Sequence, residues 1–477
     1  MKKILKTILK LITGLFLLII VLVLSVLLID LGNVGYLKIT NHPEAENRSY
    51  LIRNVNILPM TMDTVLRNKS VWIKNGVISK IAEDIDAGDM AVVDGNNKYL
   101  LPGLTDMHVH VWDDYELGLY LSNGVTAVRN VWGQPMHLRM KAAITQDKIL
   151  APMFFTSGPK LTGPEFLGDD NQQLFSVGEA KDMVVKIKNK GYDFIKTYYG
   201  LPQDYFDAIL EEAKKSDLDI AAHPSNKVPY EYHFRSGIAT VEHAEDIVQQ
   251  PLDYKLDTLK LNEVVAAFGK AHETSFCPTL TVFHNIYNML EDDDILNSSS
   301  LGQMNPMIRK MDSKAQFDRW YGTKMEDPGV VDRIKNQHMF HLLALKKLHR
   351  AGVNIVCGTD AGIGVTVPGA SIHRELELYR EAGLSNYEVL KTATVNPSKV
   401  HGFMKDFGTV ENGKMANLIL VNGNPLQDLA VLQNPEMVFI KGRKLDRKTL
   451  DEFKTAATDR SNLLASFLRY AEFLVSK

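Results

Sequence analysis

The stretch LPGLTDMHVH, residues 101–110, ends a short apolar run with two histidines that stand two positions apart. On a β-strand, residues i and i+2 point to the same face, so we expect His108 and His110 to point the same way. At the carboxyl end of a barrel strand, that face lines the mouth where catalytic residues gather. Two converging imidazoles can bind a transition metal. Taken alone, the pair does not distinguish a metal site from two structural histidines.

Short apolar runs alternate with amphipathic stretches along the middle of the chain. Eight such runs are expected to be strands: 104–110, 125–131, 153–157, 194–198, 220–223, 240–243, 275–279 and 355–359. Strands that alternate with helices indicate parallel βαβ units. Eight units predict an α/β fold, a closed (β/α)₈ TIM barrel, which we place at residues 101–402.

Both flanks of the predicted barrel contain strand-like segments. Asn75-Gly76 separates residues 71–74 from residues 77–80, which is typical of a two-residue hairpin. Residues 417–421 and 437–440 have the same character after the barrel. We therefore expect residues 48–100 and 403–446 to form one small β-sandwich. Residues 447–477 are expected to form a C-terminal helix.

One connection of the predicted barrel is unusually long. Residues 282–331 add roughly 50 residues between the seventh and eighth strands, whereas such loops usually have about 2–6. In a barrel this insertion lies on the carboxyl-end face. It is either a lid that shapes the substrate site or a surface excursion, and the sequence leaves both open.

The N-terminus carries a membrane-targeting signal. Four lysines within the first ten residues precede the apolar run 11–29, which is nearly long enough to cross a bilayer. The lysines should stay in the cytoplasm, so the rest of the chain is expected outside it. No A-x-A cleavage site follows, which favours an uncleaved anchor over a cleaved signal peptide for residues 1–35. We expect a single-pass protein of the cell membrane with a periplasmic or extracellular catalytic domain.

Composition excludes some classes of function. The 477 residues are 45% hydrophobic and 23% charged with a net charge of -3, so a large core is expected and no electrostatic footprint for nucleic acid exists. Cys277 and Cys357 lie in apolar runs, and we interpret them as buried free thiols rather than a disulfide. The absence of any CxxC pair excludes a structural zinc site built on thiolates. Whether the protein is a homo-oligomer stays open.

Four more ionisable residues follow the ends of predicted strands. Lys196 ends the fourth strand, His223 the fifth and His243 the sixth, and Asp360 follows the eighth. Each alone has a structural explanation, such as a core histidine or a helix cap. Because catalytic residues of barrels come from the carboxyl ends of several strands, the six together predict one site.

These features resemble the amidohydrolase superfamily over about residues 50–445. The matching positions are residues 101–110, Lys196, His223, His243, Thr359-Asp360, residues 393–397 and residues 408–418. Within the superfamily, residues 124–130 and 237–244 look most like the imidazolonepropionase-related group, which contains prolidase-like dipeptidases that act on Xaa-Pro substrates.

The resemblance implies roles for all six residues. Lys196 would carry a carbamate that bridges two divalent metal ions, for which we expect zinc. His108, His110 and Asp360 would hold the more buried metal, and His223 with His243 the more exposed one. Paired metals acidify a water and polarise a scissile carbonyl. Asp360 would be the catalytic residue that accepts the proton of that water.

The substrate is less defined by the sequence than the chemistry. Deaminases of the superfamily carry a glutamate after the fifth-strand histidine, and no such residue follows His223. Tyr199, Tyr232 and Arg235 are candidate substrate contacts, each with a structural alternative. We expect hydrolysis of a non-aromatic C–N amide bond in a dipeptide or N-acyl amino acid. A cyclic amide or lactone substrate, or an inactive membrane-anchored binding protein, are the alternatives.

Overall fold

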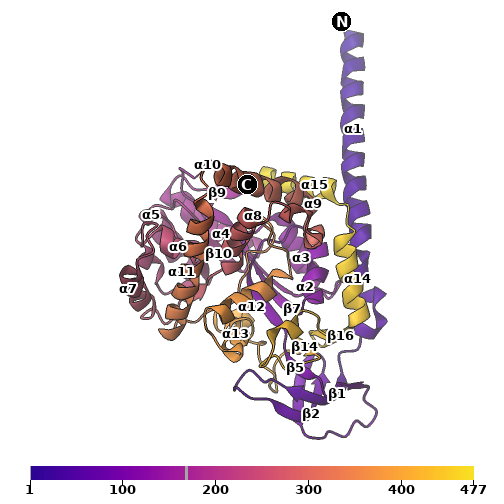
Figure 1. Cartoon of the computed structure of the whole chain (residues 1–477). Coiled ribbons are helices and arrows are strands. Elements are labelled where there is room, and N and C mark those ends of the chain that lie inside the picture. The colour runs from indigo at the N-terminus through magenta and orange to yellow at the C-terminus, as the bar shows by residue number, and fades with distance from the viewer. Residues whose placement is uncertain (1, 167–169, 477) are drawn as a thin grey trace.

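The computed structural model describes residues 2–166 and 170–476 (Figure 1). Met1 of the predicted anchor 1–35, residues 167–169 of the predicted barrel and Lys477 of the predicted C-terminal helix lie outside the described residues. Two sheets organise the body, one parallel and one mostly antiparallel.

Seven parallel strands form most of a barrel. Hydrogen bonding follows the order β13-β12-β11-β10-β8-β7-β6. The strands are β6 (Leu104–Val109), β7 (Val125–Asn130), β8 (Met153–Thr162), β10 (Phe194–Thr197), β11 (Ile220–Ala222), β12 (Ile238–Glu242) and β13 (Ser275–Cys277), with the short β9 (Asn171–Gln173) paired beside β8. They are buried on both faces, as parallel strands covered by helices are.

The eighth predicted strand closes the barrel without forming a regular strand, which corrects the expectation. Ile355 bridges to Phe276 of β13, and Ala361 bridges to Val109 of β6. Between these bridges the backbone bends, and Asp360 has a positive φ of 59°. The segment is a connector between the first and seventh strands, held at two points.

Helices cover the outside of the barrel, as the alternating pattern predicted. They are α2 (Tyr115–Ser122), α3 (Pro135–Thr145), α4 (Val177–Lys190), α5 (Gln203–Lys215), α6 (Glu245–Gln249), α7 (Thr258–Phe268), α11 (Val330–Arg350), α12 (Ser371–Glu381) and α13 (Asn386–Thr392). The capping box of α13 is present: Ser385 accepts a hydrogen bond from the Glu388 backbone, and the Glu388 side chain accepts one from the Ser385 backbone.

The strands of the two flanks join into one hydrogen-bonded, eight-stranded sheet, which encloses an apolar cluster of its own. Its order is β16-β15-β14-β5-β1-β2-β3, with β4 beside β1. Its strands are β1 (Tyr50–Ile57), β2 (Leu66–Lys74), β3 (Val77–Ala82), β4 (Val92–Asp94), β5 (Tyr99–Pro102), β14 (Leu418–Val421), β15 (Met437–Ile440) and β16 (Arg443–Asp446). The flanks join where β14 pairs with β5. The hairpin at Asn75-Gly76 is confirmed, and both residues have positive φ as a type I′ turn requires.

The long connection between the seventh strand and α11 is helical. It contains α8 (Leu280–Glu291), α9 (Pro306–Ile308) and α10 (Lys314–Glu326), and it buries an apolar cluster of its own with Val365 and Val367. Asp312 accepts a hydrogen bond of 2.6 Å from the backbone of Gly364, three residues beyond the closing bridge at Ala361. The insertion is therefore built onto the loop that follows Asp360.

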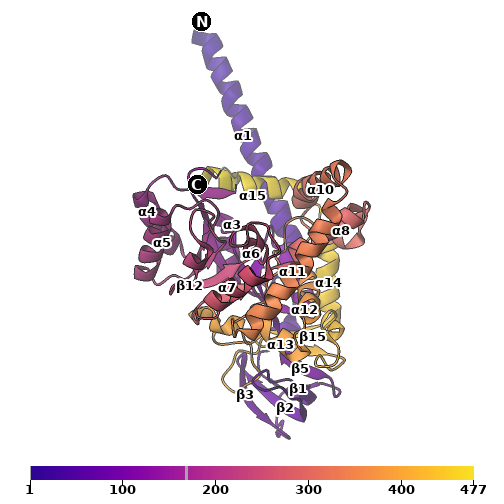
Figure 2. The same cartoon turned by 60° about the vertical axis from the view of Figure 1, so that its left-hand side comes forward.

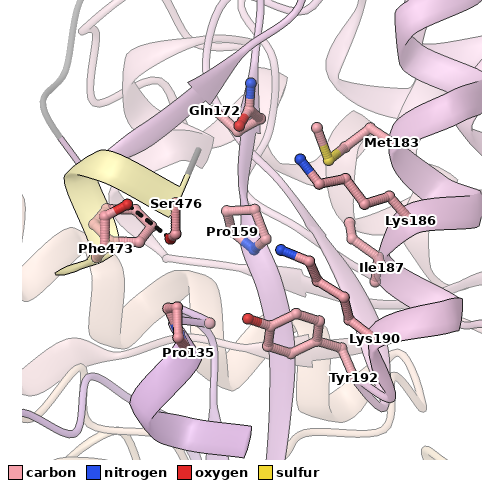
Figure 3. Close-up of a pocket in the computed structure, with 11 residues that line it drawn as sticks. Pro135, Pro159, Gln172, Met183, Lys186, Ile187, Lys190, Tyr192, Phe473 and Ser476 are labelled. Atoms are coloured by element: carbon pink, nitrogen blue, oxygen red, sulfur yellow. Dashed lines mark hydrogen bonds between the residues drawn. The ribbon is translucent and has the colours of Figure 1, made fainter.

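The C-terminal segment forms two helices, α14 (Arg447–Thr458) and α15 (Leu463–Ser476), instead of one. The chain turns between them because Arg460 and Asn462 point inward to the buried Asp113, at 2.6 and 2.9 Å. The end of α15 then lies against the loops of the barrel, with Phe473 facing Pro135 and Pro159 across a small cleft (Figure 3).

The N-terminal helix α1 (Lys2–Asn33) extends away from the body in two views (Figures 1 and 2). Its length and composition suit a membrane span, and a signal sequence has the same properties. The carboxyl end of α1 is docked: Asp30 forms an ion pair with Arg469 of α15, and Val34 and Leu37 are buried.

The Arg460–Asp113 pair yields a stability prediction. Both side chains are fully buried, so Arg460→Ala leaves a buried carboxylate without its charge partner. We expect the free energy of unfolding to fall by about 3–5 kcal/mol. Arg447→Ala is the matched control, since its pair with Asp451 is partly exposed and should contribute less than about 1 kcal/mol. Urea unfolding of the full chain, followed by tryptophan fluorescence, measures both, and equal losses would contradict the assignment.

Candidate active site

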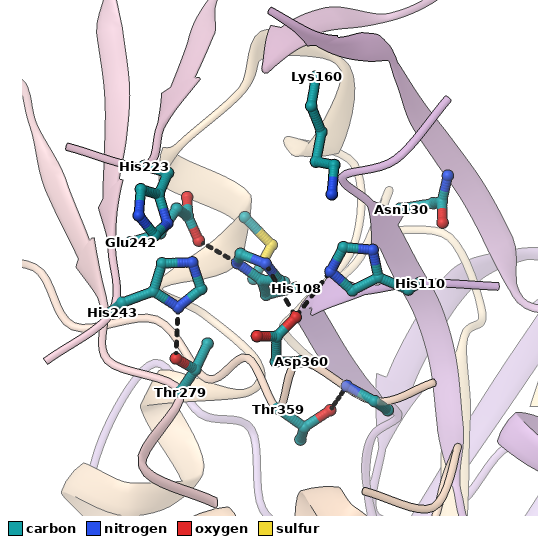
Figure 4. Close-up of polar contacts among 12 residues, drawn as sticks. His108, His110, Asn130, Lys160, His223, Glu242, His243, Thr279, Thr359 and Asp360 are labelled. Carbon is teal, nitrogen blue, oxygen red and sulfur yellow. Dashed lines mark hydrogen bonds and ion pairs between the residues drawn. The ribbon is translucent and has the colours of Figure 1, made fainter. Parts of the chain in front are cut away.

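The six predicted residues meet at the carboxyl ends of the barrel strands. Figure 4 labels all of them except Lys196. His110 Nε2 and His108 Nε2 lie 2.7 and 3.3 Å from the same oxygen of Asp360. The ring of His243 is 4.7 Å from that of His108 and 4.7 Å from that of His223, between their centroids. Each of the six residues is at most 8% exposed. They form one buried polar group in the mouth of the barrel.

Backbone strain turns two of these residues into the mouth. His243 directly follows β12 and Asp360 lies within the closing segment, and their φ angles are 67° and 59°. Non-glycine residues adopt this left-handed region at a cost, and such residues cluster at functional sites. Gly358 is needed beside them because a Cβ there would lie 2.8 Å from the Cβ of His108.

A buried glutamate that we did not assign from the sequence orients His108. Glu242 Oε2 lies 2.6 Å from His108 Nδ1, and its other oxygen accepts a 2.7 Å hydrogen bond from Arg129. This contact places the proton of His108 on Nδ1 and leaves Nε2 facing Asp360. His243 Nδ1 similarly lies 2.8 Å from the hydroxyl of Thr279. The sequence did contain a signal for Glu242, because it is the only acidic residue of a largely apolar predicted strand. An acidic residue is rarely buried without a partner.

The electrostatic environment favours a metal-binding protonation state. Burial lowers the pKa of His223 and His243 well below the usual value, so both are neutral imidazoles at pH 7. Burial raises the pKa of Asp360, but His108 and His110 outweigh this effect and hold the carboxyl ionised. Neutral histidines and ionised carboxylates are the forms that bind metals.

The donor atoms fit a cation. Ligand atoms of His108, His110 and Asp360 all lie within 4.8 Å of one another, and so do those of His108, Glu242 and Cys277. The first group fits better, because Glu242 is already paired with Arg129 and burial raises the pKa of the Cys277 thiol.

Lys196 lies in β10, inside the same mouth. It is 1% exposed, and its Nζ has no hydrogen-bond partner among the residues that the structure describes. Burial lowers its pKa to about 8, although Glu242 and Asp360 oppose the shift. A buried polar atom without a partner is costly, and it points to a group that the protein chain alone does not supply.

The structure separates the three predicted substrate contacts. The ring of Tyr199 is 5.8 Å from that of His223, so this tyrosine borders the site. Tyr232 instead donates its hydroxyl to Asp207 of α5, and Arg235 stacks on the Tyr232 ring at 3.5 Å. Arg235 precedes β12 whereas the site lies after it, so the structure does not bring Tyr232 and Arg235 to the histidines.

Lys160 is a further residue of the site that the expected strand boundary concealed. The third strand was expected to end at Ser157, but β8 continues to Thr162 and includes Lys160. Its amine pairs with Asp170 and lies 4.8 Å from the centre of the Tyr198 ring. Lys160 is 7% exposed and extends toward His110 (Figure 4).

Comparison with known proteins agrees with this geometry. The model of the Amidohydrolase family matches residues 99–445. The chain belongs to the amidohydrolase family. A dihydroorotase of Streptococcus thermophilus (strain CNRZ 1066) is 24% identical over 383 residues, which cover 73% of this chain and 85% of that enzyme.

Two solved structures share the fold of this amidohydrolase. A bottromycin amidohydrolase has a TM-score of 0.72 at 20% identity and covers 88% of this chain and 93% of its own. A Xaa-Pro dipeptidase with bound methionine in the active site has a TM-score of 0.66 at 20% identity, covering 83% and 100%. The resemblance stated from the motifs is therefore confirmed, and the chain is a hydrolase of the amidohydrolase superfamily.

The role of Glu242 is testable by zinc binding. Glu242→Gln weakens the contact that orients His108, so zinc affinity should fall by about 10- to 100-fold while the far-ultraviolet circular dichroism stays unchanged. Glu375→Gln is the control, because Glu375 is equally buried but accepts hydrogen bonds from the backbone of Leu280 and Thr281. Equal zinc affinity in the two variants would show that Glu242 does not orient the ligand.

Proposed function

We propose that this amidohydrolase cleaves the amide bond of a dipeptide or N-acyl amino acid with two divalent cations, zinc by preference, bridged by a carbamylated Lys196. The observation that carries the proposal is the buried amine of Lys196, which has no hydrogen-bond partner within residues 2–166 and 170–476 and lies among four histidines and Asp360. An ammonium has no lone pair for a metal, so the unmodified lysine cannot complete this ligand set.

Carbamylation turns the amine into a suitable ligand. The neutral Nζ forms one N–C bond to carbon dioxide and loses one proton, which leaves a carbamate anion with two oxygens. That anion can bridge two cations, one held by His108, His110 and Asp360 and the other by His223 and His243. The burial of Lys196 protects the product from bulk water.

The cations, when bound, would acidify a water molecule and polarise the scissile carbonyl. Asp360 is ionised and lies beside both β6 histidines, so it can accept a proton from the attacking water. It then gives this proton to the leaving amine as the C–N bond breaks. Trp132, whose ring centre is 6.1 Å from that of His110, helps to exclude bulk water from this step.

The residues around the metal ligands suit a substrate with a free carboxylate. Lys160 is the cation that extends into the mouth from β8, and Tyr199 offers a phenol beside His223. A carboxylate on the amine side of the scissile bond would bind Lys160 in place of Asp170. Dipeptides and N-acyl amino acids both carry such a carboxylate, and one structural relative is named a Xaa-Pro dipeptidase.

We also propose that α1 is an uncleaved anchor with the catalytic domain outside the cytoplasm. The lysines at its start favour that orientation. Two features support retention: Asp30 is ion-paired with Arg469, and residues after the helix continue into the core, where Leu37 is 1% exposed. A cleaved signal peptide has no such contacts to keep.

Removal of the Lys196 amine tests the bridge. Lys196→Ala should retain one zinc equivalent or fewer and should lose turnover by roughly 100-fold or more, because paired metals supply several kcal/mol of transition-state stabilisation. Mass spectrometry of the intact chain should show one added carbon dioxide in the natural protein and in the surface control Lys188→Ala, but not in Lys196→Ala. Full turnover with two metals in Lys196→Ala would refute the carbamate.

Lys160 is testable through substrate charge. Lys160→Met should raise KM for an N-acetyl amino acid by about 10- to 100-fold, the effect of one charge-assisted hydrogen bond. The same variant should leave KM unchanged for the substrate whose carboxylate is capped as a primary amide. Asp207→Asn, which loosens Tyr232 and Arg235 instead, should change neither value. Equal KM shifts on acid and amide would mean that Lys160 shapes the site without binding the carboxylate.

A further inference from the structure

The last helix has an apolar side that no described residue covers. On its inner side, the rings of Tyr470 and Phe473 lie 6.0 Å from Trp112 and 6.1 Å from Trp132. On its outer side, four apolar residues are 40% to 86% exposed: Leu464, Phe467, Leu474 and Val475. A soluble protein seldom exposes a row of large apolar side chains along one helix without a partner surface.

Neighbouring elements extend this apolar surface. The insertion contributes Met311, Tyr321 and Met325, which are 38% to 66% exposed, and Phe175 after β9 is 60% exposed. Figures 1 and 2 both show α10 and α15 on the side of the body from which α1 rises. We call these residues, together with the outer side of α15, the apolar rim.

The docking of α1 on the body sets how deeply the apolar rim would enter a bilayer that α1 spans. The apolar run covers residues 11–29, but α1 already contacts the body from Val23 onward, through Val26, Leu27 and the buried Asp30. Seven residues of the run, 23–29, thus lie beside the body, which corresponds to about 10 Å of helix at 1.5 Å per residue. If the run spans the bilayer, the apolar rim enters it by a similar depth, which is typical of interfacial helices.

The apolar rim is also an edge of the catalytic mouth. α15 packs on the loops that follow β6 and β7, and Phe473 contacts Trp132, which in turn contacts His110. The insertion lies on the same carboxyl-end face because it directly follows β13. The surface that faces the bilayer and the opening that admits substrate are therefore on one side of the molecule.

We propose that the apolar rim lies in the bilayer and that the enzyme takes an amphipathic amide, an amino acid N-acylated by a long fatty chain, directly from the membrane. This inference rests on the proposed amide hydrolysis and specifies its substrate class. The acyl chain stays among lipid tails while the amide enters the mouth and the carboxylate binds Lys160. Lys186 and Lys190 line the cleft at the end of α15, where they would pair with the phosphates of lipid headgroups (Figure 3).

Depth-dependent quenching tests the orientation without any assay of activity. Both native cysteines are buried, so a thiol-reactive fluorophore labels an introduced cysteine selectively. The full chain carries Val475→Cys or Met325→Cys in phosphatidylethanolamine–phosphatidylglycerol vesicles. Spin-labelled lipid tails should quench both probes. Leu259→Cys on α7 is the control, since Leu259 is 77% exposed but lies away from the apolar rim, and it should not be quenched.

Two results of this experiment would overturn the proposal. Equal quenching at Val475, Met325 and Leu259 would show no preferred face. Protection of Val475 and Met325 from lipid quenchers that grows with protein density would assign the apolar rim to a second copy of the chain.

A comparison of two substrates tests the substrate class. Phe467→Asp combined with Leu474→Asp places two charges on the apolar rim and should lower turnover of N-palmitoyl amino acid in vesicles by roughly tenfold or more. Turnover of the soluble N-acetyl amino acid should be unchanged, as should both activities in Leu259→Asp. If the natural protein cleaves the N-acetyl substrate but not the N-palmitoyl one, the membrane route is wrong. If it cleaves neither, the proposed amide hydrolysis fails, while the quenching result still decides the orientation.

Discussion

A buried charge pair, Arg129 with Glu242, is the interaction on which the mouth of this barrel depends. The guanidinium also donates to the Met107 carbonyl and the Thr240 hydroxyl, so it ties three strands together beneath the site. The carboxylate in turn fixes the tautomer of His108. A buried ion pair is stable only when its remaining hydrogen-bonding groups are satisfied, and here the Met107 carbonyl, the Thr240 hydroxyl and the His108 ring satisfy them. The same contacts therefore hold the strands together and orient His108 in the candidate site.

The contacts that close the barrel also position a residue of the candidate site. Asp106 accepts hydrogen bonds from the backbone and hydroxyl of Thr359 at 3.1 and 2.7 Å, and the Asp360 backbone donates to the His108 carbonyl at 2.7 Å. These contacts replace the regular ladder that an eighth strand would form. The closing segment is bridged to its neighbours at Ile355 and Ala361, and between these two residues it bends. The bend directs the Asp360 carboxylate toward His108 and His110.

The sequence predicted the parts of the site that follow strand periodicity and the ends of buried strands. Convergence of the six residues was accessible because apolar runs ending in an ionisable residue mark barrel strands. Lys160 was missed because Gly158-Pro159 looks like a turn, whereas β8 continues through it. Tyr232 and Arg235 were predicted as substrate contacts because they are close to His243 in the sequence. They precede β12 whereas His243 follows it, so they lie at the opposite end of the barrel from His243. The break between α14 and α15 depends on Asp113, a contact 347 residues away that no local pattern encodes.

The docked end of α1 joins the proposed membrane helix to the catalytic mouth through direct contacts. A flexible linker would let the catalytic domain rotate freely above the bilayer, and the mouth would then face any direction. Here Asp30 and Arg469 join α1 directly to α15, and α15 joins Trp132 beside His110. Each of these contacts is either a buried ion pair or a packing of aromatic rings. The orientation of α1 therefore sets the direction in which the catalytic mouth opens. With α1 in a bilayer as proposed, a substrate confined to the bilayer would meet the opening by lateral diffusion, whereas a soluble substrate would gain nothing from this orientation. On the proposed membrane route, this joint would distinguish an enzyme fed from the bilayer from one that is only tethered to it.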